Sequence, residues 1–237
     1  MARAILNPTP QRETRRRVPV LVQQTHRVPR PEHAAYARWC SEWWWTSLAT
    51  RGVPLLAHGR WQFGGADDEY TSYFVYDDLA QWAAVHDALS PQPIGWHTQA
   101  PPAASRLLEL DDVGAWQTPH LPGFGPGSVI SERTYHLRDS AREQFAHLSR
   151  ERVWPWLEQM GARLIAFGHD PLGSAEEVQT LTAFRSLADW QQLSHPTASP
   201  DAPADVVRAW NQRAALLTHS SGRLLVIEAD GAKQTRV

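Results

Sequence analysis

The chain contains an internal repeat, in which two halves carry the same short segments in the same order. Residues 52–59 and 161–168 share Gly, Leu, Ala and Gly at matching positions. Two further matches follow in order along the chain: Leu-Ala-x-Trp at 79–82 and 187–190, and Arg-Leu-Leu at 106–108 and 223–225. A series of ordered matches indicates two copies of one structural unit.

Each copy predicts the same order of elements: strand, helix, strand, strand, helix, strand. Gly52 and Gly161 suit the residue just past the end of the first helix in each copy. A short second helix is expected to begin at Asp77 or Asp78 in the first copy and at Ser186 in the second, since these residue types cap helices. The other predicted elements are 18–28, 31–50, 55–63, 70–76 and 106–110 in the first copy, and 128–137, 140–160, 164–169, 178–184 and 223–228 in the second.

The two long predicted helices share one apolar stripe. Four positions are apolar in both copies: Tyr36, Trp39, Trp44 and Leu48, which correspond to Phe145, Leu148, Val153 and Leu157. Their approximately helical spacing predicts that they face the core. Trp43 corresponds to Arg152, so its position does not demand an apolar side chain. Trp43 and Trp45 are therefore better candidates for a pocket or an interface.

Composition divides the chain into five parts. They are a basic tail at 1–17, a first repeat at 18–113, a linker at 114–127, a second repeat at 128–230 and a tail at 231–237. The linker is rich in Pro and Gly, as flexible connections are. Residues 90–104 form a second irregular stretch that carries Trp96 and His97. This stretch is either a lid or a surface excursion.

Charge and composition exclude several classes of protein. The net charge of −2 gives no basic field for nucleic acid. No apolar run approaches the ~18 residues of a membrane span, and the N-terminus lacks the apolar core of a secretory signal. Cys40 is the only cysteine, which excludes an internal disulfide and fits a cytoplasmic protein. Lys233, the only lysine, lies in the tail, so Schiff-base chemistry on a buried lysine is not expected.

Three segments of the second repeat resemble the NIPSNAP family. They are Glu-Arg-Thr-Tyr at 132–135, Phe-Arg-Ser-Leu-Ala-Asp-Trp at 184–190 and Trp-Asn-Gln-Arg at 210–213. The first repeat reads Gln-Gln-Thr-His at 23–26, where it departs from the family pattern. The resemblance implies the dimeric α+β barrel superfamily. We therefore expect an α+β fold of two tandem ferredoxin-like βαββαβ repeats whose antiparallel sheets face each other as a barrel.

The resemblance also implies a range of functions. The superfamily includes cofactor-free monooxygenases of antibiotic biosynthesis, polyketide cyclases, haem-binding enzymes and small-ligand sensors. It favours a small-molecule enzyme of specialised, natural-product metabolism: a cofactor-free cyclase or monooxygenase that acts on an aromatic or polycyclic substrate in the barrel cavity. A non-catalytic protein that binds a small ligand or a partner is the alternative, because fold does not select function. A homodimer is compatible with the sequence.

Candidate site residues lie on the first strand of each repeat. Alternate residues of a barrel strand face the cavity and the helices. The set that ends in Gln24 and His26 corresponds to the set that ends in Arg133 and Tyr135, and we expect these polar sets to face the cavity. His26 could act as a general base, Arg133 could stabilise an oxyanion and Tyr135 could donate to a developing enolate; a structural role is the alternative for each. Six residues are expected to contact substrate: Gln24, His58, Trp61, Tyr73, Trp43 and Trp96.

Metal and cofactor signals are sparse. No His-x-x-x-His or Glu-x-x-His pair lies on a predicted helix, so no metal site is expected. A phosphate-binding glycine loop and a dinucleotide fingerprint are also missing, and no cofactor is expected. Haem is the exception that the sequence leaves open, because one axial histidine suffices. The conceivable ligands are His26, His58, His169 and His195.

Overall fold

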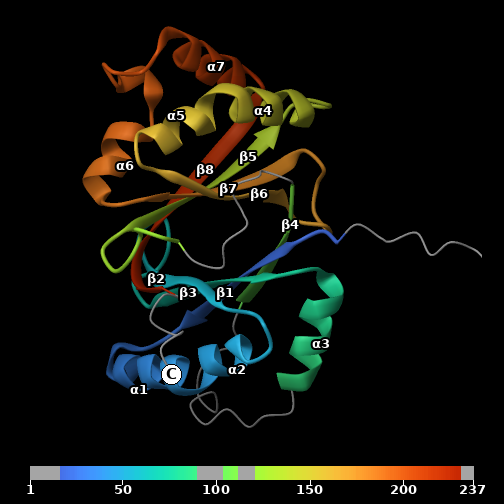
Figure 1. Ribbon diagram of the computed structural model, residues 1–237, viewed down its shortest axis with the longest axis vertical. Helices are drawn as coiled ribbons and strands as arrows, with labels where there is room; N and C mark the ends of the chain where they lie inside the picture. The colour runs from blue at the N-terminus through green and yellow to red at the C-terminus, as the bar shows by residue number, and fades with distance from the viewer. Residues whose placement is uncertain (1–16, 90–103, 112–120, 231–237) are drawn as a thin grey trace, which may run out of the picture.

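The computed structural model describes residues 17–89, 104–111 and 121–230, which form two βαββαβ repeats (Figure 1). The first repeat contains β1 (Val20–Arg27), η1 (Arg30–Glu32), α1 (His33–Trp39), η2 (Cys40–Trp44), α2 (Trp45–Ala49), β2 (Leu55–Phe63), β3 (Glu69–Tyr76), α3 (Leu79–Leu89) and β4 (Ala104–Leu110). The second contains β5 (Val129–Leu137), α4 (Arg142–Leu148), η3 (Ser149–Val153), α5 (Trp154–Gln159), β6 (Arg163–His169), β7 (Glu177–Phe184), α6 (Leu187–Leu193), η4 (Pro196–Ala198), α7 (Ala204–Ala215) and β8 (Leu217–Asp230). The predicted order of elements is therefore confirmed.

The strands of the described residues close into one barrel, in the order β1-β3-β2-β8-β5-β7-β6-β4. The two repeats join at two antiparallel seams, where β2 pairs with β8 and β4 pairs with β6. The long β8 makes the first seam extensive, because it pairs along β5 and also along β2. The expected α+β fold of tandem ferredoxin-like repeats in a barrel is confirmed.

One glycine of each repeat lies at a seam. A Cβ atom on Gly59 of β2 would lie 1.9 Å from the carbonyl oxygen of Val226 on β8. A Cβ atom on Gly168 of β6 would lie 2.2 Å from the carbonyl oxygen of Glu109 on β4. Any side chain would therefore collide with the backbone of the neighbouring strand, so a close approach of two strands requires glycine at both positions.

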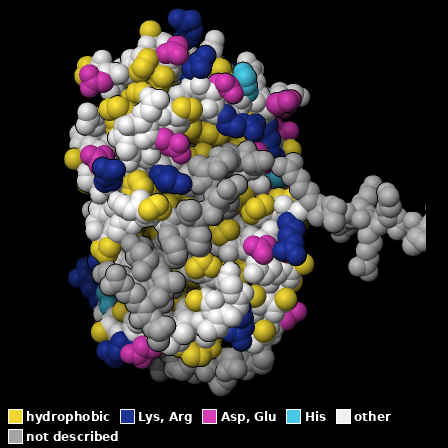
Figure 2. Space-filling model, in the orientation of Figure 1, with side chains coloured by type: hydrophobic (Ala, Val, Ile, Leu, Met, Phe, Trp, Pro, Cys, Tyr) yellow, Lys and Arg dark blue, Asp and Glu magenta, His cyan; other side chains and the backbone are white. Residues whose placement is uncertain are grey.

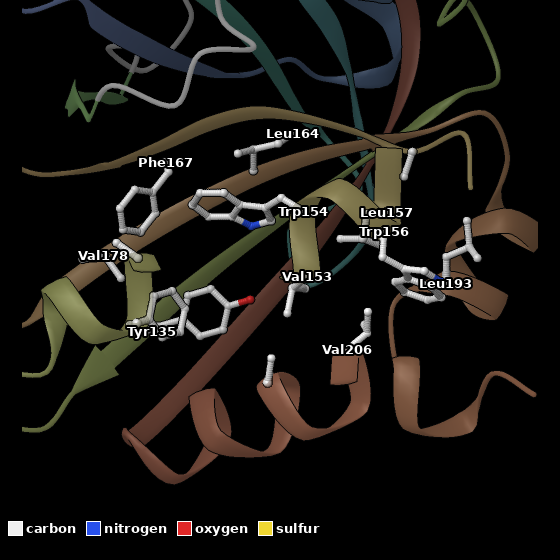
Figure 3. Close-up of a cluster of buried hydrophobic side chains, with 14 of the residues drawn as sticks. Tyr135, Val153, Trp154, Trp156, Leu157, Leu164, Phe167, Val178, Leu193 and Val206 are labelled. Atoms are coloured by element: carbon white, nitrogen blue, oxygen red, sulfur yellow. The ribbon is translucent and has the colours of Figure 1, made fainter. Parts of the chain in front are cut away.

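The barrel lies between two groups of helices (Figure 1). Helices α1, α2 and α3 cover the outer face of the first sheet, and α4 to α7 cover the outer face of the second. Each sheet packs on its helices through an apolar core, and Figure 3 shows the core of the second repeat. A third core fills the barrel with side chains of both repeats, among them Leu21, Leu108, Ile130, Ile165, Leu181 and Leu225.

A π turn interrupts the long helix of each repeat. The sequence predicts continuous helices over 31–50 and 140–160, but η2 (Cys40–Trp44) and η3 (Ser149–Val153) divide them at equivalent positions of the two repeats. Apolar periodicity does not reveal such a turn, because the stripe continues across it. A π turn is rare and frequently lies near a functional site.

The segment before the last strand of the second repeat, which contains the extra residues, folds into η4 and α7. The sequence shows the insertion but assigns no structure to it. Helix α7 packs on α4 and on η3, so this segment adds a further helix to the outer layer of the second sheet.

The strand faces are opposite to those expected. Val22 and Val129 belong to the sheet–helix cores, whereas Leu21 and Ile130 belong to the barrel interior. The residues that alternate with Val129 on β5, including Tyr135, consequently face the helices. An eight-stranded barrel is just wide enough for its own side chains, so its apolar residues turn inward.

The surface of the protein carries charged side chains of both signs. On the face shown in Figure 2, basic and acidic side chains are interspersed. Within the described part of the chain, the helices are too short or too polar to cross a bilayer. Leu121 and Phe124, from the predicted linker, are buried against the barrel interior. Residues 1–16 and 231–237 of the tails, the first half of the linker and nearly all of the predicted lid, including Trp96, lie outside the described residues.

Candidate functional site

A pocket opens between the sheet and the helices of the second repeat. It is formed by the outer face of β5 and β7 together with α5, α7 and Ser194, and Figure 3 shows part of this region. Its enclosed volume is about 30 Å³, and its empty space is about 360 Å³ when the open mouth is included. Little of this space is therefore enclosed by protein.

Alternate residues of β5 and β7 line one side of this pocket. Alternate residues of a strand face one side of the sheet. In this way β5 contributes Ser131, Arg133 and Tyr135, and β7 contributes Thr180, Thr182 and Phe184. The helices contribute Trp154, Leu157, Trp210 and Arg213. Hydroxyl groups and aromatic rings thus surround two guanidinium groups.

Arg213 is buried in this pocket, although arginine is normally an exposed residue. Only 4% of its surface is exposed. Its guanidinium carbon lies 4.4 Å from the ring centre of Phe145, 5.2 Å from that of Trp210 and 5.8 Å from that of Tyr135. Burial lowers the pKa of Arg213, the Tyr135 phenol opposes this shift, and Arg133 adds to it. The Nε atom of Arg213 has no hydrogen-bond partner.

The pocket is positively charged. No Asp or Glu is among the described residues that line it. Likewise, no carboxylate of the described residues forms an ion pair with Arg133 or Arg213. The charge of Arg133 is also felt by nearby His195, whose pKa is lowered first by burial and then by Arg133. Two guanidinium groups therefore face a space that has no carboxylate among its described lining residues.

The matching space in the first repeat is filled. Gln24 and His26 occupy the positions that Arg133 and Tyr135 occupy in the second repeat. The side chains packed there are mostly aromatic: Tyr36, Trp45, Tyr70 and Phe74, together with His58. The two halves of the symmetric scaffold therefore differ most at the predicted site strand.

Two predicted site histidines lie inside this packed region. The Nδ1 atom of His58 is 2.9 Å from the hydroxyl oxygen of Ser72, and its ring stacks on Tyr70 at 5.5 Å. Burial, assisted by the nearby His26, lowers the pKa of His58 to about 3, so this ring is neutral at pH 7. His26 is 4% exposed, and its ring centre lies 5.6 Å from that of Tyr36.

The structure brings only two of the three predicted catalytic residues together. Arg133 and Tyr135 line the pocket of the second repeat. His26 lies in the sheet–helix layer of the first repeat, on the far side of the barrel. A general base for a reaction at Arg133 and Tyr135 must therefore be sought elsewhere than at His26.

Tyr73 and Trp61 lie inside the barrel. The Tyr73 hydroxyl donates a hydrogen bond of 3.0 Å to Glu132, and Arg223 pairs with the same carboxylate. Burial above all, with the neighbouring Glu132 charge, raises the pKa of Tyr73. The Arg223 guanidinium lies 4.1 Å above the Trp61 ring. A cavity of about 360 Å³ adjoins Glu132 and Arg223. Sequence reasoning did not identify Glu132, although it belongs to the quoted 132–135 motif.

The remaining predicted contacts lie outside the second-repeat pocket. Trp43 is half-buried and stacks on Trp39 at 5.7 Å and on Trp44 at 5.9 Å. Gln24 is half-buried, and its Oε1 atom has no hydrogen-bond partner. Trp96 belongs to the stretch that is not described.

Sequence reasoning missed the residues that α7 contributes to the pocket. Val206, Ala209 and Arg213 share the buried face of this helix. A charged residue at a position of the apolar helical period was the available signal, because arginine is almost never buried without a partner. The quoted Trp-Asn-Gln-Arg segment also contains both Trp210 and Arg213.

The four histidines that could ligate a haem lie outside the second-repeat pocket, as its described lining contains no histidine. His26 and His58 are enclosed by aromatic rings, and His169 is engaged by Arg142 at 2.8 Å. His195 is exposed beside Trp210. In the described ranges, no three His, Cys, Asp or Glu side chains are grouped so that they could hold a metal ion.

Comparisons with known proteins identify the fold. No protein-family model and no curated protein matches this sequence. The structure is similar to a proposed monooxygenase from Lactobacillus acidophilus, with 9% identity, 89% of this chain and 94% of that chain covered, and a TM-score of 0.65. A proposed monooxygenase from Fusobacterium nucleatum matches with 12% identity, 91% and 95% coverage and a TM-score of 0.61. The fold is thus that of the dimeric α+β barrel proteins.

A NIPSNAP family protein from Agrobacterium tumefaciens matches in part. The identity is 19%, the match covers 43% of this chain and 86% of that chain, and the TM-score is 0.36. Membership of the NIPSNAP family therefore stays a prediction.

Proposed function

We propose that this chain is a small-molecule enzyme of the cofactor-free monooxygenase type, with its active site in the sheet–helix pocket of the second repeat. The substrate is an aromatic or polycyclic molecule of natural-product metabolism. The observation that carries the proposal is that Arg133 and Tyr135 share one face of β5, in a pocket whose walls include Trp154 and Trp210. This pocket replaces the barrel cavity that the sequence favoured.

The residues of the pocket suit the stabilisation of the enolate that such a reaction needs. Without a cofactor, the substrate itself must supply electrons to dioxygen, so it must first become a carbanion or enolate. The Tyr135 hydroxyl is placed to donate a hydrogen bond to the enolate oxygen, and Arg133 stabilises its charge. Dioxygen then oxidises the activated CH₂ group to a carbonyl, and its second oxygen atom leaves with two hydrogens as water.

Oxygen consumption tests this proposal. The purified protein is mixed with a panel of hydroxylated tricyclic aromatics, and oxygen uptake and product mass are measured. Tyr135→Phe and Arg133→Gln are each expected to reduce turnover by roughly 100-fold, the usual contribution of one such group. Tyr76→Phe, a buried tyrosine of the first repeat, serves as the matched control. Full turnover in both pocket variants contradicts the site, and turnover without oxygen uptake assigns a cyclase instead.

One observation favours the alternative of a non-catalytic ligand-binding protein. The described lining of the pocket contains no histidine or carboxylate that could take the substrate proton. A carrier needs only the aromatic walls and the polar groups. Quenching of tryptophan fluorescence by panel members that are never converted would support this alternative.

A further inference from the structure

We propose that the ligand of the second-repeat pocket carries a carboxylate, which Arg213 and Arg133 bind together. This inference rests on the proposed location of the site and adds the chemical class of its ligand. It does not depend on whether the ligand is converted.

The first support is the state of Arg213. Only 4% of its surface is exposed, and its Nε atom lacks a hydrogen-bond partner. The aromatic rings of Phe145 and Trp210 stabilise a cation but accept no strong hydrogen bond from it. An anion bound beside this buried guanidinium would therefore accept the hydrogen bond that its Nε–H group does not make within the protein.

The second support is Arg133. It lines the same pocket, and its positive charge opposes the ionised form of Arg213. Arg213 is buried and Arg133 is half-buried, and an anion between them would relieve the repulsion of these like charges. The described lining provides no Asp or Glu for this role, so a bound anion is the group that satisfies both arginines.

The size and shape of the pocket select a carboxylate. An enclosed volume of about 30 Å³ accommodates roughly two water-sized groups, such as the two oxygen atoms of a carboxylate. A planar guanidinium binds a carboxylate through two parallel hydrogen bonds. The hydroxyl groups of Tyr135, Thr180 and Thr182 surround the same space and supply further polar contacts. The open part of the pocket, between aromatic walls, then receives the ring of the ligand.

The first repeat provides an internal comparison. At the position of Arg133 it has the neutral Gln24, and at the position of Tyr135 it has His26. Arg213 lies on α7, and the segment between α3 and β4 of the first repeat lies outside the described residues. At the two matching strand positions, only the second repeat therefore has a guanidinium group.

Binding of two matched probes tests the inference. The probes are 2-naphthoate and the neutral 2-naphthamide, which differ in charge but hardly in size, and their affinities are measured by calorimetry with the full-length protein. We expect naphthoate to bind at least tenfold more tightly than naphthamide. Equal affinities, or binding of neither probe, would overturn the inference.

Variants assign the preference to the two arginines. Arg133→Gln and Arg213→Met are expected to abolish the preference for naphthoate while naphthamide binding is retained. Arg142→Gln is the matched control, because Arg142 pairs with Asp111 outside the pocket and should leave the preference unchanged. Because Arg213→Met removes a core residue, Arg133→Gln and the probe pair decide the matter if that variant does not fold. A preference that survives Arg133→Gln contradicts the proposed site.

The binding experiments and the oxygen-uptake experiments can fail independently of each other. Naphthoate binding that depends on Arg133, in a protein that consumes no oxygen with any panel member, keeps the carboxylate pocket and rejects the oxygenase. Oxygen uptake that depends on Tyr135, with no preference for naphthoate, keeps the oxygenase and rejects the carboxylate.

Discussion

Gly59 and Gly168 occupy equivalent places at the two seams of the barrel, one against Val226 of β8 and the other against Glu109 of β4. The glycine that ends the repeated sequence segment is therefore the residue that lets one repeat approach the other. The sequence repeat and the closure of the barrel have the same physical basis at this point.

Gly59→Ala and Gly168→Ala are each expected to lower the free energy of unfolding by about 3 kcal/mol or more, at the upper end of overpacking effects. The reason is the collision of the new Cβ atom with a backbone carbonyl, which no rotamer relieves. Urea denaturation followed by circular dichroism measures the loss. Gly222→Ala is the control, because its Cβ atom would meet only ordinary contacts, at 3.6 Å from the carbonyl oxygen of Glu132.

Tyr73→Phe is expected to destabilise the protein by about 1–3 kcal/mol, since a buried, charged acceptor loses one of its donors. Tyr73 belongs to the first repeat and Glu132 to the second, so their hydrogen bond joins the two halves inside the barrel. The measurement is again the free energy of unfolding in urea, compared with Tyr76→Phe. Equal stability of the wild type and Tyr73→Phe would show that Arg223 alone satisfies Glu132.

His58 makes the stability depend on pH. Its pKa is lowered to about 3 in the folded chain, from 6.5. The unfolded chain therefore binds a proton between pH 6.5 and 3 that the folded chain does not bind. The stabilisation by neutral His58 is complete above pH 6.5 and falls as the pH drops toward 3, with a slope on the order of 1 kcal/mol per pH unit.

The variant His58→Phe tests this dependence, because Phe167 occupies the equivalent position in the second repeat. The difference in unfolding free energy between wild type and variant, measured from pH 7 to pH 4, isolates the contribution of His58 from those of other histidines. As the pH falls, the unfolding free energy of the variant should rise relative to that of the wild type. Parallel curves would mean that His58 has the same pKa in the folded and the unfolded chain.

Ser149→Ala is expected to cost about 1 kcal/mol. The fully buried Ser149 begins the π turn of the second repeat, and its hydroxyl donates a hydrogen bond of 2.6 Å to the carbonyl oxygen of Phe145. Thermal unfolding measures the effect. Ser41→Ala is the matched control: Ser41 makes the same kind of bond to Ala37, at 3.0 Å, but is exposed and should change stability by less than about 0.5 kcal/mol. An equal loss of stability in both variants would show that burial of the hydroxyl group does not explain the effect of Ser149→Ala.

Much of the fold could be read from the chain, because its determinants are local and recur. The apolar stripe of the long helix, the glycine after it and the strand sequences each depend on neighbouring residues, and each appears twice. The positive φ of 77° at Gly52 and 89° at Gly161 agrees with their predicted place past the helix ends. The candidate site could be predicted only in part. The sequence identified Arg133 and Tyr135 as site residues, but not Arg213 and Trp210.

The sequence by itself determined the repeat, the order of the elements and the strand that distinguishes the two copies, since periodicity and residue type act over short distances. Only the tertiary structure decided which face of that strand meets the helices, because two sheets must first close before their apolar faces turn inward. It also decided where the charge lies. Arg213 reaches the pocket from a helix far along the chain from Arg133, and only the packing of α7 against η3 and α4 brings the two guanidinium groups to one space.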